Sequence, residues 1–542
     1  MSSTQSLPLF IWLSLKPLLI SCSLTTLCLA QDTPRPAIDA DIVLQGGTLF
    51  IGDGQPGIRG DLAIKDGRIV GVGKFEVGKV KQIIDCQGLI VCPGFIDLHN
   101  HSDSSVLASS TRAVMNYVTQ GCTTIVTGNC GSGPIEVALY YDKIDQLGAG
   151  VNVAHLLPQG ELRDKVVGKD QRPATEAELE QMRSLARQAM LDGAWGMTSG
   201  LIYVPSSYAD TNELTKIAEI VAEHGGIYAS HIRGEGTDLL DAVSEALKIG
   251  QQAKLPVHIS HFKSSGKDSW GLVRTAVELI KSQRDAGQVI TADQYPYTAS
   301  STSLAATVIP AWARSGGTEA TLKRFEDNAP EAESIRAAIQ KKLDLTDAGH
   351  RIQIAYFKPR PEWAGLRLDE IATAEGLSPL EMVLNIERQG GASIVNHSIN
   401  EEDVRFVMTL PWVATASDGS SRIPSDEVPH PRSYGTFPRK LGRYAVQEGV
   451  VELSQAIRSC SGLPADILGL SDRGYLRTDY AADVVVWKQD QFIDTATFVA
   501  PHSYATGIDY LFVNGVPAIA NGRATGALAG KALRHRSTTI SQ

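Results

Sequence analysis

The chain has 542 residues, of which 43% are hydrophobic and 20% are charged, and it contains 50 glycines. This composition excludes a disordered, collagen-like or disulfide-scaffold protein, and the length allows one large domain with a smaller one. The formal net charge of −10 argues against nucleic acid as a partner, because nucleic-acid binding rests on basic patches.

The first thirty residues are predicted to be a secretory signal peptide. The stretch LPLFIWLSLKPLLISCSLTTLCLA is apolar or small except for Lys16, and it offers a small-residue cleavage site after Ala30. An uncleaved membrane anchor is the alternative, and LISC also resembles a lipobox that would place a lipid on Cys22. No later stretch approaches the roughly 20 apolar residues of a spanning helix. We therefore expect an exported protein, periplasmic or secreted, without a stable membrane span after signal removal.

An odd number of cysteines follows the predicted signal peptide: Cys86, Cys92, Cys122, Cys130 and Cys460. A disulfide framework is not expected for a core of this size. The odd number leaves at least one thiol free for other chemistry.

Short strand-like segments are predicted at both ends of the mature chain. Residues 41–92 contain DIVLQGGTLF and DLAIKDGRIVGVG, and residues 476–530 contain ADVVVWK and YLFVNGVPAIANG. Gly-Asp and Asp-Gly turns separate such strands. We expect the two parts to pair into one small β-domain.

Residues 93–475 alternate between short apolar runs and amphipathic helical segments. For example, TNELTKIAEIVAEHG precedes IYASH, and LLDAVSEALKIGQQAK precedes PVHISH. Apolar strands with intervening helices indicate parallel strands buried on both faces, and about eight such units predict an α/β fold with a (β/α)8 TIM barrel. VITADQ and ASIVNH are both candidates for the seventh strand. Residues 310–365 break the alternation and are predicted to be an insertion that covers the barrel mouth.

Metal-ligand and proton-transfer residues occur where the predicted barrel strands end. FIDL ends in His99 and His101, TTIVTGN in Cys130, IYAS in His231, VHIS in His261 and WVATAS in Asp418. Active sites of such barrels form at the carboxyl ends of the strands. Taken singly, such a histidine is more often a packed residue, Cys130 a small buried hydrophobe and Asp418 a turn or helix cap. Their joint placement favours a zinc site, because imidazole, thiolate and carboxylate are the usual zinc ligands.

The motifs GFIDLHNHSD, GNCG, YASHIRGE, ISHFK and ASDG, in this order, resemble those of the amidohydrolase superfamily. More narrowly, they resemble the D-aminoacylase (N-acyl-D-amino-acid deacylase) family, over about residues 41–530. GNCG is the most specific of them, because most of the superfamily uses a carboxylated lysine on the fourth strand. The predicted fourth strand here, WGMTSGL, has no lysine.

The resemblance implies a role for each matching position. Cys130, His231 and His261 would hold one tightly bound Zn²⁺. His99, His101 and Asp418, with Cys130 bridging, would form a second, weaker site. The residues that match substrate contacts of the family are Lys263, Tyr295, Ser301 and Arg432.

The chemistry of these residue types agrees with amide hydrolysis next to a free carboxylate. Zinc with an open position lowers the pKa of its water to about 7 and polarises a carbonyl. Asp418 would act as the general base and acid, taking the proton of the water and delivering it to the leaving amine. Arg432 can bind a carboxylate bidentately, whereas Lys263 would add a point charge. The expected reaction releases a carboxylate and a free D-amino acid from a small N-acyl-D-amino acid.

Three features depart from the family pattern and concern the side chain of the substrate. SGPIE follows GNCG, the segment GSSRIPSDEVP after Asp418 is longer than expected, and His397 in ASIVNHSIN stands at a strand end. His397 would either touch the substrate or be packed. The enzyme alternative is an amidohydrolase acting on cyclic amides, as hydantoinases and dihydroorotases do, or on unusual dipeptides. A non-catalytic barrel that binds a cell-wall fragment or a metal is the alternative of another class.

Overall fold

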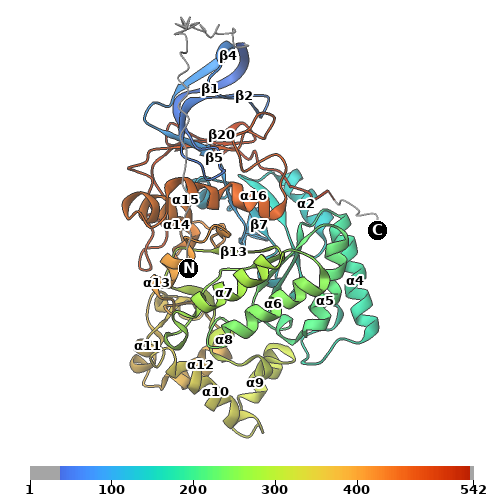
Figure 1. Cartoon of the computed structure of the whole chain (residues 1–542). Coiled ribbons are helices and arrows are strands. Elements are labelled where there is room, and N and C mark those ends of the chain that lie inside the picture. The colour runs from blue at the N-terminus through green and yellow to red at the C-terminus, as the bar shows by residue number, and fades with distance from the viewer. Residues whose placement is uncertain (1–36, 537–542) are drawn as a thin grey trace, which may run out of the picture.

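The computed structural model describes residues 37–536, so the predicted signal peptide (residues 1–30) and Cys22 lie outside the described residues. Within this range, eight short parallel strands form the centre of the larger domain (Figure 1). They are β6 (Phe95–Asp97), β7 (Cys122–Thr127), β8 (Asn152–His155), β10 (Gly196–Gly200), β11 (Ile227–His231), β12 (Val257–Ile259), β13 (Ile290–Gln294) and β17 (Val413–Thr415).

Backbone contacts close these strands into a barrel. β6, β7 and β8 form one sheet, and the two-residue β9 (Leu157–Pro158) joins β10, β11, β12, β13 and β17 in another. The Trp195 N–H donates to the His155 carbonyl between the two sheets on one side. On the other side, a bridge pairs Asn100 after β6 with Gly419 after β17. The predicted (β/α)8 barrel is therefore confirmed.

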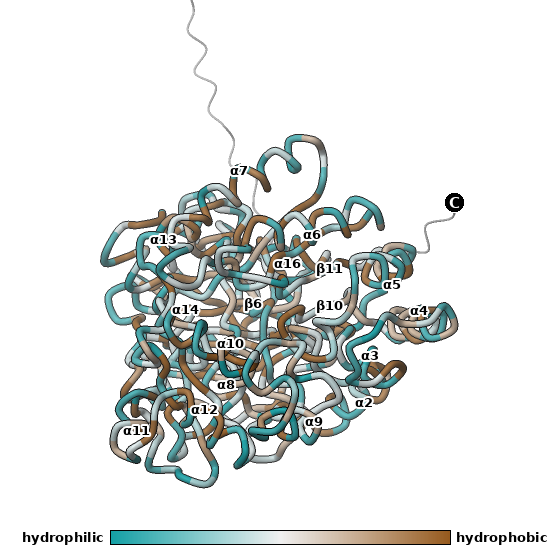
Figure 2. The backbone as a smooth tube through the Cα atoms, turned by 90° about the horizontal axis from the view of Figure 1, so that it is seen from below, coloured by the Kyte–Doolittle hydropathy of each residue, from teal (hydrophilic) through white to brown (hydrophobic). Residues whose placement is uncertain are grey.

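Amphipathic helices surround the strands, as Figure 2 shows for α4, α5, α6 and α7 around β10 and β11. The main ones are α2 (Val137–Leu147), α4 (Glu176–Leu191), α5 (Thr211–Glu223), α6 (Leu239–Ala253) and α7 (Leu272–Asp285). In α5, the Asp210 carboxylate caps the first turn by accepting from the Glu213 N–H. Leu214, Ile217 and Val221 recur at helical spacing and are fully buried.

The seventh barrel strand is β13, which contains VITADQ, and the other candidate lies elsewhere. ASIVNH contains β16 (Ser393–Asn396), which pairs antiparallel with β14 (Ser300–Ser303) and β15 (Ile352–Tyr356). Helices α8 (Leu304–Val308), α9 (Gly317–Arg324), α10 (Ala332–Asp344), α11 (Leu368–Ala374) and α12 (Pro379–Arg388) pack with this sheet around an apolar core of their own. The inserted elements thus run from 300 to 396, beyond the expected 310–365 on both sides.

Strands from both ends of the chain form one sheet, as predicted. The first part contains β1 (Ala37–Leu49), β2 (Ile58–Lys65), β3 (Arg68–Gly73), β4 (Glu76–Asp85) and β5 (Ile90–Pro93). The second contains β18 (Val484–Trp487), β19 (Ile508–Val513), β20 (Val516–Ala520) and β21 (Arg523–Ala524). The two parts meet where β5 pairs antiparallel with β18, with Pro93 opposite Val484. This confirms the small β-domain, which lies above the barrel in Figure 1.

The five cysteines after the predicted signal peptide are buried free thiols. Among residues 37–536, no helix combines the length and the apolar character that crossing a membrane requires.

Candidate metal centre and active site

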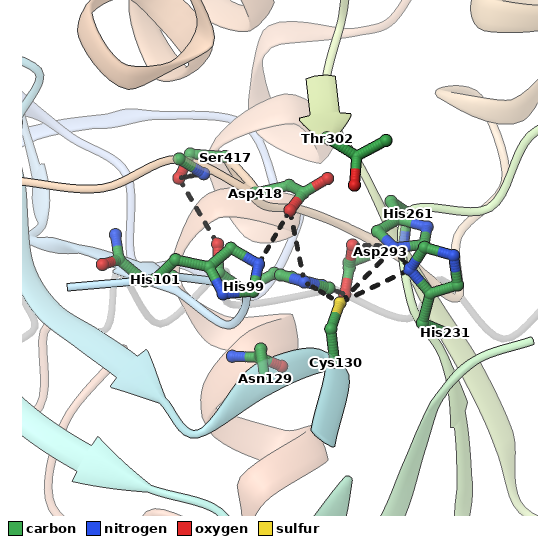
Figure 3. A network of polar contacts seen from close by, with 12 residues as sticks. His99, His101, Asn129, Cys130, His231, His261, Asp293, Thr302, Ser417 and Asp418 are labelled. Atoms are coloured by element: carbon green, nitrogen blue, oxygen red, sulfur yellow. Dashed lines mark hydrogen bonds and ion pairs between the residues drawn. The ribbon is translucent and has the colours of Figure 1, made fainter. Parts of the chain in front are cut away.

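The six predicted metal-ligand and catalytic side chains meet at the carboxyl end of the barrel. His99 and His101 follow β6, Cys130 follows β7, His231 ends β11, His261 follows β12 and Asp418 follows β17. Carboxyl ends of parallel strands open on the same side of a barrel, which brings residues far apart in sequence together. Figure 3 shows the polar contacts of this cluster converging on the sulfur of Cys130.

The Cys130 sulfur lies at the centre of the cluster. It is 3.2 Å from Nε2 of His99, 3.5 Å from Nδ1 of His231 and 3.8 Å from Nε2 of His261. A tetrahedral zinc with ordinary bond lengths separates its ligand atoms by about 3.3 to 3.8 Å. Thiolate and imidazole are also the donors that zinc prefers. The donor set therefore fits a zinc ion, and the distances from the sulfur are close to this range, whereas Nε2 of His261 and Nδ1 of His231 lie 2.8 Å apart.

Two groups of potential ligands share Cys130. Cys130, His231 and His261 form one group, and Cys130 also belongs to the second, with His99, His101 and Asp418. Within each group, the potential ligand atoms all lie within 4.8 Å of one another. Cys130 would therefore belong to the ligands of both groups if each of them held an ion.

Asp418 connects the histidines to Arg432. Its Oδ1 is 3.0 Å from Nε2 of His101 and 3.5 Å from Nε2 of His99. Its Oδ2 accepts from Nη1 of Arg432 at 2.7 Å. One oxygen therefore faces the donor cluster, and the other is held by a guanidinium.

Three of the six residues have a left-handed backbone conformation. The φ angles are +53° at Cys130, +37° at His261 and +52° at Asp418. Such angles are uncommon for residues with a Cβ and persist where the surroundings enforce them, often at functional sites. Here each angle turns the chain sharply just after a barrel strand ends.

The electrostatics of the cluster favour anionic Cys130 and Asp418. Burial opposes ionisation of the Cys130 thiol, but the imidazoles of His99 and His231 outweigh it and hold its pKa well below the usual value. Burial likewise opposes ionisation of Asp418, but Arg432 and His99 hold the pKa of this carboxyl well below its usual value. Both groups are thus in the form that binds a cation.

The four predicted substrate-binding residues lie beside this cluster. The Arg432 guanidinium lies 4.8 Å and the Lys263 ammonium 5.6 Å from the centre of the Tyr295 ring. The buried Tyr295 hydroxyl has no hydrogen-bond partner among the described residues. Ser301 accepts from Arg432 through its carbonyl, while its hydroxyl donates to the Ile394 carbonyl in the inserted sheet. Two cations and the Tyr295 hydroxyl, which has no partner among the described residues, therefore lie close together beside the donor cluster.

Two cavities open from the cluster and share His101, Ser301, Thr302, Asp418 and Arg432. The larger, of about 420 Å³, also contains Cys130, Gly131, Tyr203 and Lys169, and we name it the Tyr203 cavity. The smaller, of about 290 Å³, also contains Tyr356, Arg422, Glu427 and His430, and we name it the Arg422 cavity. A substrate with two arms can occupy both cavities with its reacting bond between them.

Comparison with known proteins identifies the family of this chain. The model of the amidohydrolase family matches residues 82–519. D-aminoacylase of Alcaligenes xylosoxydans xylosoxydans is 34% identical over 516 residues, which cover 91% of this chain and 97% of that protein. The chain belongs to the amidohydrolase family, among the D-aminoacylases. It is thus a metal-dependent amidohydrolase.

Two solved structures that are similar to this chain come from proteins described with a metal. A D-aminoacylase studied for the role of its binuclear metal centre has a TM-score of 0.79 and 31% identity, over 92% of this chain and 100% of that one. The N-acyl-D-glutamate deacylase of Bordetella bronchiseptica, complexed with zinc and a phosphonate inhibitor, has a TM-score of 0.78 and 29% identity over the same shares.

Two carboxylates that hold the histidines of the donor cluster in this chain were not predicted from the sequence. Asp293, at the end of β13, accepts from the His261 N–H at 2.7 Å and lies 3.4 Å from Nδ1 of His99. Glu235 lies 2.9 Å from Nδ1 of His261 and 2.5 Å from Nζ of Lys263. Asp293 ends a strand like the predicted ligands, and that position was the available signal. Glu235 follows His231 in HIRGE, but nothing in that spacing predicts its contact with Lys263.

The structure packs His397 away from both cavities. Its Nε2 is 3.1 Å from Oε1 of Gln353, and its ring centre is 4.9 Å from that of Phe498. Burial lowers the pKa of His397 to about 4. Of the two expectations for this residue, packing is the one the structure supports.

Proposed function

We propose that this chain is a zinc-dependent hydrolase that cleaves the amide bond of N-acyl-D-amino acids. The products are a carboxylate and a free D-amino acid. The observation that carries the proposal is the Cys130-centred donor cluster next to Arg432, where two cavities meet. D-handed substrates are supported by the relatives, which are named for D-amino acid derivatives.

In this proposal, Cys130, His231 and His261 hold the tightly bound zinc, and His99, His101, Cys130 and Asp418 form a weaker second site. The two groups of potential ligands that share one sulfur support two neighbouring sites. Zinc at such a site polarises a carbonyl and makes a water a nucleophile near neutral pH. Asp293 and Glu235 orient the histidines through hydrogen bonds, as carboxylates do behind many metal sites.

Asp418 transfers the proton. It accepts the proton of the attacking water as the new C–O bond forms, and it donates this proton to the nitrogen as the C–N bond breaks. Its Oδ1 faces the donor cluster, which is the correct side for this exchange. Arg432 holds the other oxygen and so keeps the carboxylate aimed.

Arg432 and Tyr295 bind the free carboxylate of the substrate. A guanidinium has five N–H donors. Arg432 uses one on Asp418 and one on the Ser301 carbonyl, which leaves three for a substrate carboxylate. Tyr295 contributes a hydroxyl without a partner in the described residues. Lys263 is already paired with Glu235, so it contributes mainly through its position beside the ring.

The test is amine release by the zinc-loaded protein from paired N-acetyl-D- and N-acetyl-L-amino acids, with Met, Leu, Phe and Glu among them. Release from the D set alone is the expected result. Release from the L set alone would overturn the stereochemical assignment. Release from neither set, with zinc bound, would reject the reaction and direct attention to cyclic amides and unusual dipeptides.

We also propose that the protein works outside the cytoplasm. The support is the predicted signal peptide over residues 1–30. Fractionation of cells that produce the full chain tests this, and an unprocessed protein found only in the cytoplasm would reject it.

A further inference from the structure

We propose that the Arg422 cavity receives the side chain of the D-amino acid and selects an uncharged side chain that both donates and accepts hydrogen bonds. A carboxamide, as in glutamine or asparagine, has this chemistry. The inference rests on the proposed function, since it concerns the same reaction.

The two cavities differ in their position relative to the reacting bond. Cys130 lines the Tyr203 cavity and does not line the Arg422 cavity. The carbonyl of the substrate must lie at the donor cluster around Cys130, so the acyl group extends into the Tyr203 cavity. The other half of the substrate is held by Arg432 through its carboxylate, and its nitrogen receives a proton from Asp418. The amino-acid side chain therefore extends into the Arg422 cavity.

The charged groups that line the Arg422 cavity form ion pairs. Nη1 of Arg422 donates to Oε2 of Glu427 at 2.6 Å, and Arg432 pairs with Asp418 at 2.7 Å. Two imidazoles also face the cavity. His101 contacts Asp418, and the Nδ1 of His430 accepts from the Arg432 N–H while its Nε2–H donates to the Ala299 carbonyl. The two arginines and the two carboxylates that line the cavity are therefore matched one to one.

The Arg422–Glu427 pair offers both a donor and an acceptor. Within the described residues, Nη2 of Arg422 and Oε1 of Glu427 have no hydrogen bond. A carboxamide oxygen can accept from the guanidinium while its NH₂ group donates to the carboxylate. A carboxylate or an ammonium would pair with one partner but meet like charge on the other. An aliphatic side chain would cover both groups without satisfying either, which costs binding energy.

The wall that carries Glu427 is fixed on two sides. Nε2 of His502, from the segment between β18 and β19, lies 2.8 Å from the Glu427 carbonyl. The next residue, Val428, donates its N–H to the Ala355 carbonyl of the inserted sheet at 2.9 Å. Nε of Arg422 in turn donates to the Ser420 hydroxyl. A preorganised pair loses less entropy on binding than one on a free loop.

The experiment compares kcat/KM for N-acetyl-D-Gln, N-acetyl-D-Glu, N-acetyl-D-Lys and N-acetyl-D-Leu in the wild-type protein and two variants. We expect the wild type to favour D-Gln over each of the others by about tenfold or more, which corresponds to one good hydrogen bond. Glu427→Gln leaves the Arg422 guanidinium without its carboxylate. The ratio of kcat/KM for N-acetyl-D-Glu to that for N-acetyl-D-Gln should therefore rise by about tenfold. Arg422→Gln leaves the Glu427 carboxylate without its guanidinium. The ratio of kcat/KM for N-acetyl-D-Lys to that for N-acetyl-D-Gln should rise by a similar factor.

Asp466→Asn is the matched control, because it breaks a comparable pair with Arg458 outside both cavities. It should leave all four ratios unchanged. Metal content and melting temperature show whether each variant is folded.

Wild-type preference for D-Glu, D-Lys or D-Leu, or unmoved ratios in both variants, would overturn the inference while the proposed function stands. Absence of hydrolysis of every N-acetyl-D-amino acid would instead reject the proposed function, and the inference with it.

Discussion

Removing the Tyr295 hydroxyl should stabilise the free protein and weaken catalysis at the same time. This hydroxyl is buried without a partner among the described residues, and a buried hydroxyl without a hydrogen bond costs about 1 to 3 kcal/mol. Tyr295→Phe keeps the ring that contacts Arg432 and Lys263 but removes that cost. We therefore expect the free energy of unfolding to rise by about 1 to 2 kcal/mol.

The change in melting temperature is small for a protein of this size. The entropy of unfolding is roughly 2.1 cal/mol/K per residue, so each kcal/mol should raise Tm by about 1 °C for a chain of roughly 500 residues. Burial raises the pKa of Tyr295 to about 12, so the hydroxyl is a neutral donor at working pH. Its hydrogen bond to a substrate carboxylate should contribute about 1.5 to 3 kcal/mol. Losing it predicts a fall in kcat/KM of about 10- to 150-fold.

Tyr297→Phe is the matched control for this prediction. The Tyr297 hydroxyl is also buried and without a partner among the described residues, but the ring of Tyr297 lies against Arg439, whereas that of Tyr295 lies against Arg432 and Lys263. This variant should gain stability and keep its kcat/KM. The assays are thermal unfolding of both zinc-loaded variants and amine release from N-acetyl-D-amino acids. A lower Tm for Tyr295→Phe, or an unchanged kcat/KM, would refute the reasoning.

Three further predictions concern the metal centre and the inserted segment. Asp418→Ala should keep zinc at the tight site but lose at least about 10²-fold in kcat, and near wild-type turnover at normal zinc content would reject Asp418 as the proton carrier. Asp293→Asn should weaken zinc binding by about 10- to 100-fold in chelator competition, whereas unchanged affinity would mean that it does not orient the ligands. Burial raises the pKa of Glu387 from 4.5 to about 7, against the opposing effect of Arg314. The folded state thus binds this proton more tightly, so stability should fall as pH rises from about 4.5 to 7. Glu387→Gln should flatten that fall in Tm, and an unchanged profile would contradict the assigned pKa.

The strand-end rule accounts for what could be predicted from the sequence. It placed His99, His231 and His261 together although their separations in sequence carry no common spacing, because every parallel strand ends on the same side of the barrel. The rule does not say which polar residue at a strand end binds the metal and which one orients a metal ligand through a hydrogen bond. Asp293 ends β13 as Asp418 follows β17, and only the distances separate their roles.

The inserted segment shows where local pattern stops being informative. β14 is SSTS, which has no apolar alternation, and it becomes a strand through pairing with β16. β16 is SIVN, whose central residues are as apolar as those of a buried barrel strand. The sequence pattern therefore did not decide whether β13 or β16 was the seventh barrel strand. The ion pair between Arg432 and Asp418 could not be predicted from the sequence either, because it depends on how the chain turns between β17 and α14 (Arg432–Pro438).

The pairing of β5 with β18 has a consequence for synthesis of the protein. Val484 emerges from the ribosome 391 residues after Pro93, since 484 − 93 = 391. At translation speeds of roughly 5 to 20 residues per second, about 20 to 80 s pass between the two. During that time, the edge of β5 that later pairs with β18 has no native partner, and the apolar face of the first half-sheet is uncovered. Newly made chains should therefore depend on protection of this edge, because the sheet begun by residues 37–93 is completed only by residues 484–524.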